Sequence, residues 1–270
     1  MSKWRPSNDA GCLYVIPDIH GASGLLDMVL KRILPLRKSD GIHDKIIFMG
    51  DYIDRHQDGH KVIDTLISLK QKYKENVICL TGNHELLMLQ ALGMIAADCS
   101  YYDSWIKNGG YFTLLGYMDR AGINEDPLNL NISRLRDFIP DAHKKFLLED
   151  LVPYYELDNF VFVHGGFNPL SDISKVNIET LTWDRQLYKF VIEAIDNNQE
   201  LPWDKVVVTG HNSFGRCRLP VITNKYMMLD CGGPKCLLIT ELQSMEAFMA
   251  FPDKNRLIKI NLQETIGRHA

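Results

Sequence analysis

An apolar run is followed at once by charged residues in the segment Lys45-Ile46-Ile47-Phe48-Met49-Gly50-Asp51-Tyr52-Ile53-Asp54-Arg55-His56. The apolar part is typical of a buried strand. Carboxylates at the end of a buried strand are unfavourable unless positive charge neutralises them. Arg55 balances one of the two aspartates, so we expect other residues or a bound cation to supply the remaining positive charge.

Three apolar runs in the first half of the chain share this plan, because each ends in polar residues. They are Cys12–Ile16 followed by Asp18 and His20, Lys45–Met49 followed by Asp51, and Asn76–Thr81 followed by Asn83 and His84. Helical patterns follow the three runs at Ser23–Leu34, where Ser23 can cap the helix, at His60–Lys74 and at Leu86–Ala97. The polar motifs recur after 33 residues (51 − 18) and 32 residues (83 − 51), which suits β-α-β units of roughly 30 residues. We therefore expect three parallel strands whose carboxyl ends meet at one edge of a sheet, where ligands bind.

Strand patterns resume in the second half of the chain. Phe160–Val163 is followed by His164, and Lys205–Val208 is followed within three residues by His211. Four closely spaced runs predict meander pairs, at Tyr226–Asp230, Cys236–Thr240, Met245–Phe251 and Arg256–Leu262. Residues 99–150 interrupt the strand pattern and predict a mostly helical insertion within a single domain, residues 1–270. We expect an α/β sandwich in which two sheets are faced by helices.

Composition limits the class of protein. The net charge of −4, from 30 Lys+Arg and 34 Asp+Glu, does not favour nucleic acid as a partner. No apolar run reaches the roughly 20 residues needed to span a bilayer, and the amino terminus lacks an apolar signal core. Six cysteines without a C-x-x-C pair are typical of reduced thiols. We therefore expect a cytoplasmic monomer that binds neither membranes nor nucleic acids.

The strand-end turns supply oxygen and imidazole groups but no sulfur. Together they carry Asp18 and His20, Asp51 with Asp54 and Arg55, Asn83 with His84, His164, and His211. A single histidine at a strand end is more often a hydrogen-bonded core or surface residue than a metal ligand. Four of the nine histidines lie at such ends, however, which favours a metal site as the interpretation of the whole set. These donor types suit Mn, Fe or Zn and argue against a thiolate zinc site.

The order of these motifs resembles that of the phosphoprotein phosphatase family of calcineurin-like metallophosphatases. The motifs are Asp18-x-His20-Gly21, Gly50-Asp51-x-x-Asp54-Arg55, Gly82-Asn83-His84-Glu85, His164-Gly165-Gly166 and Gly210-His211. Three more are similar to the bacterial and bacteriophage group of lambda-phage-type phosphatases: Trp105-x-x-Asn108-Gly109-Gly110, Trp183-Asp184-Arg185 and Leu229-Asp230-x-Gly232. The resemblance covers residues 13 to about 239. It implies an αββα sandwich, with two central mixed β-sheets flanked by helices.

The resemblance also implies a centre of two divalent metal ions. In such a centre Asp18, His20 and Asp51 would hold the first ion, and Asp51 would bridge to a second ion held by Asn83, His164 and His211. Manganese is the expected metal in vitro, with iron and zinc as alternatives. His84, charged and oriented by Asp54, would protonate the leaving group. Arg55 and Arg185 would bind phosphoryl oxygens through the planar, bidentate geometry of the guanidinium group.

The implied function is metal-dependent hydrolysis of phosphomonoesters by a hydroxide that bridges the two metals. The expected substrates are phosphoserine and phosphothreonine in proteins, with phosphotyrosine or a small phosphoester as further options. One alternative is a nucleotide hydrolase, such as a diadenosine tetraphosphatase or a cyclic phosphodiesterase, in which aromatic residues of Tyr101–Phe112 stack a base. A second alternative is a catalytically silent domain that binds phosphorylated partners. The presence of Asp54 favours a phosphomonoesterase over the nucleotide hydrolase, and the silent domain is disfavoured because no metal ligand or acid is missing.

Overall fold

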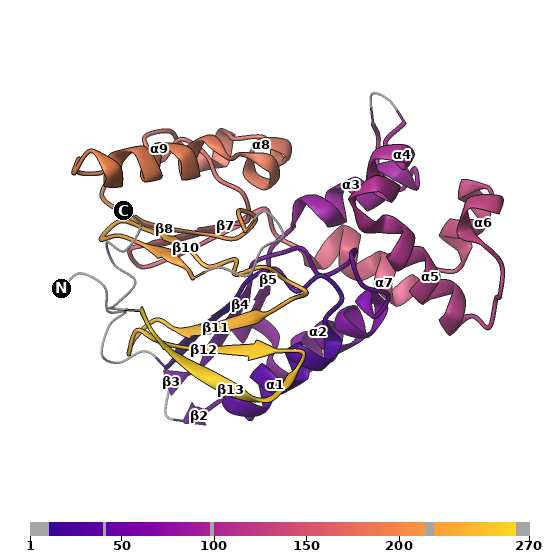
Figure 1. The fold of residues 1–270 in the computed structure, drawn as a ribbon, viewed down its shortest axis with the longest axis horizontal. Coiled ribbons are helices and arrows are strands. Elements are labelled where there is room, and N and C mark those ends of the chain that lie inside the picture. The colour runs from indigo at the N-terminus through magenta and orange to yellow at the C-terminus, as the bar shows by residue number, and fades with distance from the viewer. Residues whose placement is uncertain (1–10, 40–41, 98–99, 214–218, 263–270) are drawn as a thin grey trace.

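The computed structural model describes residues 11–39, 42–97, 100–213 and 219–262. Residues 1–10, on which the expectation about a signal core rests, and Cys99, where the expected insertion begins, lie outside these ranges. Within the described part, two β-sheets lie face to face and helices cover both outer sides (Figure 1). The predicted αββα sandwich with two mixed sheets is confirmed.

The first sheet has six strands in the order β13-β12-β11-β1-β4-β5. Its strands are β1 (Leu13–Ile16), β4 (Lys45–Phe48), β5 (Val77–Cys79), β11 (Leu237–Glu241), β12 (Glu246–Phe251) and β13 (Lys254–Asn261). The pairs β1–β4 and β4–β5 are parallel, as the β-α-β spacing predicts, and β11, β12 and β13 form an antiparallel meander. The small pair β2 (Lys38–Ser39) and β3 (Ile42–His43) stands apart from this sheet.

The second sheet has five strands in the order β6-β7-β8-β10-β9. They are β6 (Tyr154–Leu157), β7 (Phe160–Val163), β8 (Val206–Thr209), β9 (Val221–Ile222) and β10 (Tyr226–Met228). The pairs β7–β8 and β8–β10 are parallel. The expectation that the run at Tyr226 joins the carboxyl-terminal meander is therefore wrong, because β10 belongs to the other sheet. Its two partners are β8 and β9, and β9 directly precedes it in the chain.

The alternation of side chains along the strands explains the layers. In the first sheet Val15 is in register with Ile47, and Ile47 with Ile78, and all three face the second sheet. The neighbouring residues, such as Ile16 and Phe48, point to the other side. Each strand of this sheet therefore contributes to two separate apolar cores, one between the sheets and one under the helices.

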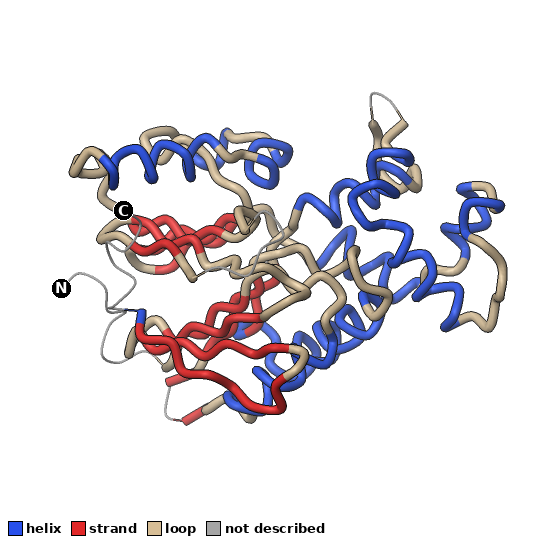
Figure 2. Tube along the Cα trace, in the orientation of Figure 1, coloured by secondary structure: helices blue, strands red, loops and turns tan. Residues whose placement is uncertain are grey.

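Two helix pairs cover the outer faces of the sandwich (Figures 1 and 2). Helices α1 (Ser23–Ile33) and α2 (Gly59–Tyr73) pack on the first sheet, and α8 (Ile178–Trp183) and α9 (Gln186–Asp196) pack on the second. The prediction that Ser23 caps α1 is wrong, since its hydroxyl donates to Asp58 Oδ2 at 3.1 Å instead. Short 3₁₀ turns lie at η2 (Lys74–Asn76), η4 (Pro127–Asn129) and η6 (Ile173–Lys175).

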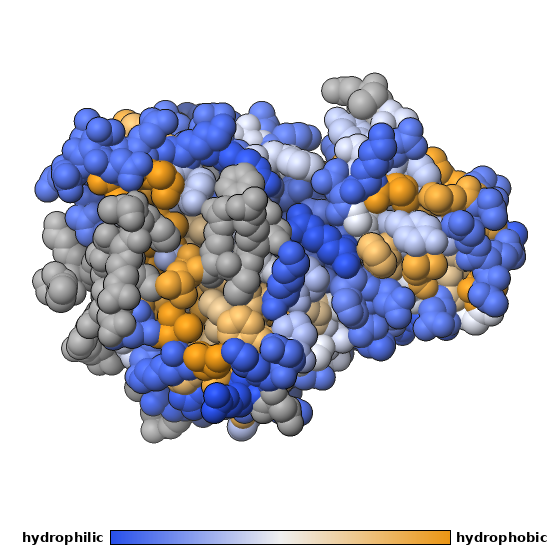
Figure 3. All heavy atoms as spheres, in the orientation of Figure 1, coloured by the Kyte–Doolittle hydropathy of each residue, from blue (hydrophilic) through white to orange (hydrophobic). Residues whose placement is uncertain are grey.

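The remaining helices lie to the right of the sheets in Figure 1. They are α3 (Asn83–Ala91), α4 (Tyr102–Trp105), η3 (Ile106–Gly110), α5 (Tyr111–Arg120), α6 (Ile132–Asp137), α7 (Asp141–Lys145) and η5 (Phe146–Asp150), of which η3 and η5 are π-helical turns. Helix α3 begins at Asn83, inside the polar motif, rather than at Leu86. Figure 3 shows a mostly hydrophilic surface on this side, with hydrophobic side chains gathered over α4–α6 and between the two sheets.

None of the four described cysteines, Cys12, Cys79, Cys231 and Cys236, forms a disulfide, which agrees with the expected reduced thiols. In residues 11–39, 42–97, 100–213 and 219–262, no helix combines the length and the apolar character that crossing a bilayer requires.

Candidate metal centre

Every polar turn singled out in the sequence lies at the carboxyl end of a strand or of its extension. The turns follow β1, β4, β5, β7 and β8, which belong to both sheets, and they meet where the parallel strands of the two sheets end. The side chains that they bring together are all buried: Asp18, His20, Asp51, Asn83, His164 and His211. Turns that directly follow strands of two packed sheets hold their side chains in a defined arrangement.

Several of these turns have a left-handed backbone that favours glycine. The non-glycine residues with positive φ at the site are His20 (48°), Asp51 (55°), Asp54 (68°), Arg55 (65°) and His211 (67°). Each such conformation costs free energy and persists only where the surrounding structure enforces it. Five of the nine non-glycine residues with positive φ in the described part of the chain lie here, which supports the interpretation of this region as a functional site.

Asp51 lies between histidines from the two sheets. Its Oδ2 is 3.5 Å from His20 Nε2, and its Oδ1 is 3.3 Å from His164 Nε2. Burial alone would raise the pKa of Asp51, but the adjacent imidazoles of His164, His84 and His20 lower it well below its usual range. One carboxylate that reaches both sides is the arrangement that a bridging ligand needs.

Two imidazole nitrogens at the centre have no hydrogen-bond partner. His20 Nδ1 is hydrogen-bonded to the carbonyl of Ile53 at 3.0 Å, which leaves Nε2 as the lone-pair nitrogen. Among the described residues, Nε2 of His20 and Nε2 of His211 are buried and have no hydrogen-bond partner. Buried polar atoms are nearly always satisfied, so these two nitrogens fit ligands of a cation.

Two groups of ligand atoms are close enough to hold a metal ion. One consists of His20, Asp51 and His84, and the other of Asp51, His164 and His211, with ligand atoms in each group within 4.8 Å of one another. Asn83 Oδ1 lies 3.0 Å from His164 Nε2, beside the second group. The shared Asp51 and the nitrogen and oxygen donors are consistent with a centre of two divalent metals.

Asp18 is at the centre, but it is not a member of either of these two groups. Both of its oxygens accept the backbone N–H of His211 at 3.1 Å. Burial, and then the nearby carboxylate of Asp230, raise the pKa of Asp18 well above its usual range. A second buried carboxylate close to Asp51 increases the need for bound positive charge. Its role as a metal ligand stays a prediction.

The predicted acid pair is assembled. His84 Nδ1 lies 2.7 Å from Asp54 Oδ2, and both side chains are buried. Burial disfavours a charged imidazole, yet the carboxylates of Asp51 and Asp54 raise the pKa of His84 above its ordinary value. The other nitrogen, His84 Nε2, accepts from Arg55 at 3.1 Å. His84 also belongs, with His20 and Asp51, to the first group that could hold a metal ion. Its geometry alone therefore allows two roles, as the general acid and as a metal ligand.

Arg55 and Arg185, the two predicted arginines, line one cavity of about 450 Å³ beside the metal centre. It is lined by Arg55, Arg185, His211, Ser213, Gly233, Pro234 and Lys235. The guanidinium of Arg185 is oriented by bonds to the carbonyl of His211 (3.1 Å) and to Asn212 Oδ1 (3.2 Å). Lys235 was not predicted from the sequence, because only the fold brings it to the edge of this cavity. Three cationic side chains favour an anionic ligand here despite the net negative charge of the chain.

Glu85 holds together the turn that follows β4, a role that was not predicted from the sequence. Its carboxylate accepts four backbone N–H groups, from Asp51 (2.8 Å), Tyr52 (2.8 Å), Ile53 (3.3 Å) and Gly82 (3.0 Å). Burial and the neighbouring Asp51 raise the pKa of Glu85 to about 7. The signal for this role is the position of Glu85, three residues after Gly82, where a capping-box acid is expected.

Comparisons with known proteins agree with the fold. A family model described as calcineurin-like phosphoesterase matches residues 13–228. The Shewanella-like protein phosphatase 1 of Plasmodium berghei is 27% identical over 202 residues, which are 73% of this chain and 46% of that protein. The chain thus spans less than half the length of that relative.

Two solved structures share the fold. A serine/threonine phosphatase from Saccharomyces cerevisiae superposes with a TM-score of 0.55 at 15% identity, covering 94% of this chain and 80% of that one. A cold-active protein-tyrosine phosphatase of a Shewanella species gives 0.54 at 17% identity, with 96% and 83% covered. At such identities the likeness shows the fold alone.

Proposed function

This chain belongs to the calcineurin-like phosphoesterase family, and we propose that it is a phosphatase of phosphoserine and phosphothreonine in proteins. It is a metallophosphoesterase with buried histidine and aspartate groups for metal. The finer assignment rests on one observation, the intact pair of Asp54 and His84 beside the metal-sized groups.

The residues that would hold two divalent cations are Asp18, His20 and Asp51 on one side and Asp51, Asn83, His164 and His211 on the other. The two buried Nε2 atoms without partners support this assignment. Divalent cations bound at such a site lower the pKa of water to give a nucleophile at neutral pH, and they stabilise charge on a phosphoryl group. Manganese is the proposed metal in vitro, with iron and zinc as alternatives.

The acid pair favours a leaving group that needs a proton. Serine and threonine leave a phosphate ester as basic alkoxides, so their departure gains from a positioned general acid. His84 Nε2 is the nitrogen available for this proton, because Nδ1 bonds to Asp54. Arg55 now donates to Nε2 and has to leave it before Nε2 can carry a proton. A bound phosphoryl group would draw Arg55 away, since charge-assisted bidentate bonds to phosphate are stronger.

The cationic cavity supplies the binding side of the proposal. Arg55 and Arg185 would hold two phosphoryl oxygens, and Lys235 adds a third positive charge at the mouth. The carbonyl of His211 and the amide oxygen of Asn212 orient the Arg185 guanidinium before substrate arrives. Such preorganisation reduces the entropy that binding costs.

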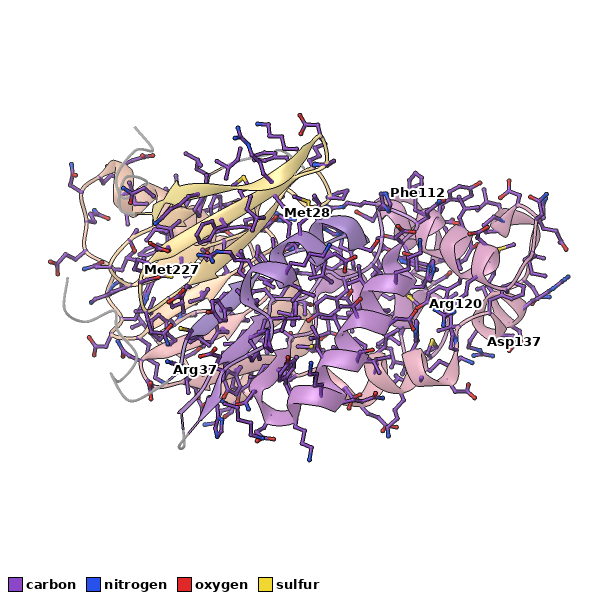
Figure 4. All side chains as sticks on the ribbon, turned by 90° about the horizontal axis from the view of Figure 1, so that it is seen from below. Met28, Arg37, Phe112, Arg120, Asp137 and Met227 are labelled. Carbon is purple, nitrogen blue, oxygen red and sulfur yellow. The ribbon has the colours of Figure 1, made fainter. Side chains whose placement is uncertain are left out.

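The aromatic segment gives little support to the nucleotide alternative. Trp105 is fully buried and its indole N–H bonds to Asp54, so Trp105 has no free face for a base. Phe112 is 44% exposed and projects from the outer surface of the insertion (Figure 4). Neither ring offers a stacking platform within the cationic cavity.

A substrate panel tests the proposal. Purified protein with Mn²⁺ is assayed against serine-, threonine- and tyrosine-phosphorylated peptides and against diadenosine tetraphosphate. Preferred hydrolysis of the serine and threonine phosphopeptides is expected. Dominant release of ADP from the dinucleotide would instead assign a nucleotide hydrolase. Binding of phosphopeptides without turnover, with any of Mn²⁺, Fe²⁺ or Zn²⁺, would assign a silent binding domain.

A further inference from the structure

Asp54 receives hydrogen bonds from the helical insertion as well as from His84. The indole N–H of Trp105, in α4, lies 3.1 Å from Asp54 Oδ1 and 3.0 Å from Oδ2. The hydroxyl of Thr113, in α5, lies 2.6 Å from Oδ1. Asp54 and Trp105 are fully buried and Thr113 is 1% exposed, so solvent does not compete for these bonds.

The direction of each bond follows from the chemistry of the donors. The indole N–H can only donate. The Thr113 oxygen accepts from the backbone N–H of Asp54 at 2.8 Å, so its own hydrogen goes to Asp54 Oδ1. Asp54 is therefore an acceptor toward both residues of the insertion. The remaining acceptor position on Oδ2 faces His84 Nδ1, which must donate.

Glycines allow the insertion to approach the Asp54-Arg55 turn closely. Gly109 has φ +111°, its carbonyl accepts the backbone N–H of Arg55 at 3.2 Å, and a Cβ there would lie 2.6 Å from that nitrogen. A Cβ on Gly110 would overlap the ring of Trp105. The spacing Trp105-x-x-Asn108-Gly109-Gly110 thus places an indole against a carboxylate that lies 51 residues earlier in the chain.

We infer that Trp105 and Thr113 are positioning residues of the general acid. This inference rests on the proposed function. The three hydrogen bonds of Trp105 and Thr113 fix the Asp54 carboxylate. Asp54 in turn holds His84 with Nδ1–H toward Asp54 and Nε2 toward the leaving group. The helical insertion is then part of the catalytic apparatus, because Trp105 and Thr113 bond to the Asp54 carboxylate.

The test compares two substrates of nearly equal size whose leaving groups differ in basicity. The p-nitrophenolate anion leaves without a proton, whereas phenolate from phenyl phosphate is more basic and gains from the acid. Trp105→Phe keeps an aromatic ring, although a smaller one, and removes the N–H donor. Thr113→Val keeps the shape and removes the hydroxyl. We expect each variant to lower kcat on phenyl phosphate by roughly 10- to 100-fold, which is a part of the roughly 10²- to 10⁴-fold that a general acid contributes. On p-nitrophenyl phosphate we expect less than about a threefold change.

Two matched variants serve as controls. Thr113→Ser retains the hydroxyl and should restore the rate on phenyl phosphate to near that of the wild type. Trp203→Phe removes another buried indole N–H, which donates to the carbonyl of Lys225 at 3.0 Å away from the centre, and should leave both rates unchanged. Bound metal is measured in every variant and should equal that of the wild type.

The outcomes separate the inference from the function on which it rests. Equal losses on both substrates, a loss of metal, or no loss on phenyl phosphate would overturn the positioning role alone. Wild-type protein that hydrolyses neither substrate with any of the three metals would overturn the proposed function and the inference with it. If Trp105→Phe does not fold, the Thr113→Val and Thr113→Ser pair decides by the same comparison.

Discussion

The carboxylate of Glu85 accepts the backbone N–H of Asp51 at 2.8 Å. Glu85, at the start of α3, thereby sets the position of Asp51, which belongs to both groups of side chains that could hold a metal ion. The same carboxylate accepts from Tyr52, Ile53 and Gly82. It thereby holds the turn after β4 against the turn after β5. These hydrogen bonds maintain the strained backbone of Asp51, which has a positive φ of 55°.

Glu85→Gln should destabilise the protein. One carboxylate oxygen becomes an amide NH₂, which cannot accept, so N–H groups of the turn lose their partner. Each buried group left unsatisfied costs roughly 1–3 kcal/mol. Urea unfolding should show a lower free energy of unfolding with an unchanged m-value. Glu179→Gln, at an exposed residue of α8, should stay within about 0.5 kcal/mol of the wild type. Equal stability of the Glu85 variant and the wild type would remove this role.

Asp51→Asn and His84→Asn should separate metal binding from acid catalysis. Asp51→Asn removes the charge shared by both metal-sized groups, so bound metal measured by elemental analysis should fall. In the wild type, Mn²⁺ should also raise Tm, because a ligand that binds only the folded state stabilises it. The Tm of Asp51→Asn should respond less.

His84→Asn should keep its metal and lose about 10²- to 10⁴-fold in kcat, as expected for removal of a general acid. A loss of metal in this variant would instead make His84 a ligand, in line with its place in the group with His20 and Asp51. Wild-type turnover in His84→Asn would exclude the acid role.

Arg185→Ala should weaken substrate binding. Its guanidinium lines the cationic cavity and is oriented by the carbonyl of His211, so we expect kcat/KM to fall about 10- to 100-fold, mainly through KM. Arg185→Lys should recover little of this loss because an ammonium lacks the planar fork. Lys189→Ala, at an exposed position of α9, is the control and should change neither constant. Unchanged constants in Arg185→Ala would argue against substrate contact.

His143 should make stability depend on pH. Burial lowers its pKa below the usual 6.5, although Asp64 opposes the shift. The bonds agree with a neutral ring, since Nδ1 lies 2.9 Å from Tyr117 Oη and Nε2 lies 2.8 Å from Asp64 Oδ1. Arg120 and His60, which also face this cluster, disfavour a charged imidazole. The unfolded chain therefore binds the proton more readily than the folded chain.

The stability contributed by a neutral His143 is complete above about pH 6.5 and is lost as the pH falls below that value. His143→Gln should accordingly show a smaller fall in the free energy of unfolding between about pH 7.5 and about pH 5.5 than the wild type. Urea unfolding at intermediate pH values measures the difference. His56→Gln, at an exposed histidine, should keep the wild-type slope. Identical slopes for His143→Gln and the wild type would contradict the assignment.

Much of the fold could be predicted because it depends on local patterns. The apolar runs at Cys12–Ile16, Lys45–Met49 and Asn76–Thr81 became parallel neighbours, since β-α-β units permit few other arrangements. Boundaries were less accurate. Helix α3 starts at Asn83 because Glu85 caps it through Gly82, and β10 pairs with β8 and β9 of the second sheet rather than with the carboxyl-terminal meander.

The amino-acid sequence by itself determined which residues meet at the centre, because a polar turn directly after a buried parallel strand must lie at the carboxyl edge of its sheet. Only the tertiary structure decided how these residues are held. The bonds of Glu85 to the β4 turn and of Trp105 to Asp54 join segments 34 and 51 residues apart. They depend on how α3 and the insertion pack against the first sheet. No local pattern encodes such packing, since hydrogen bonds between distant side chains form only after the apolar layers have set their distance.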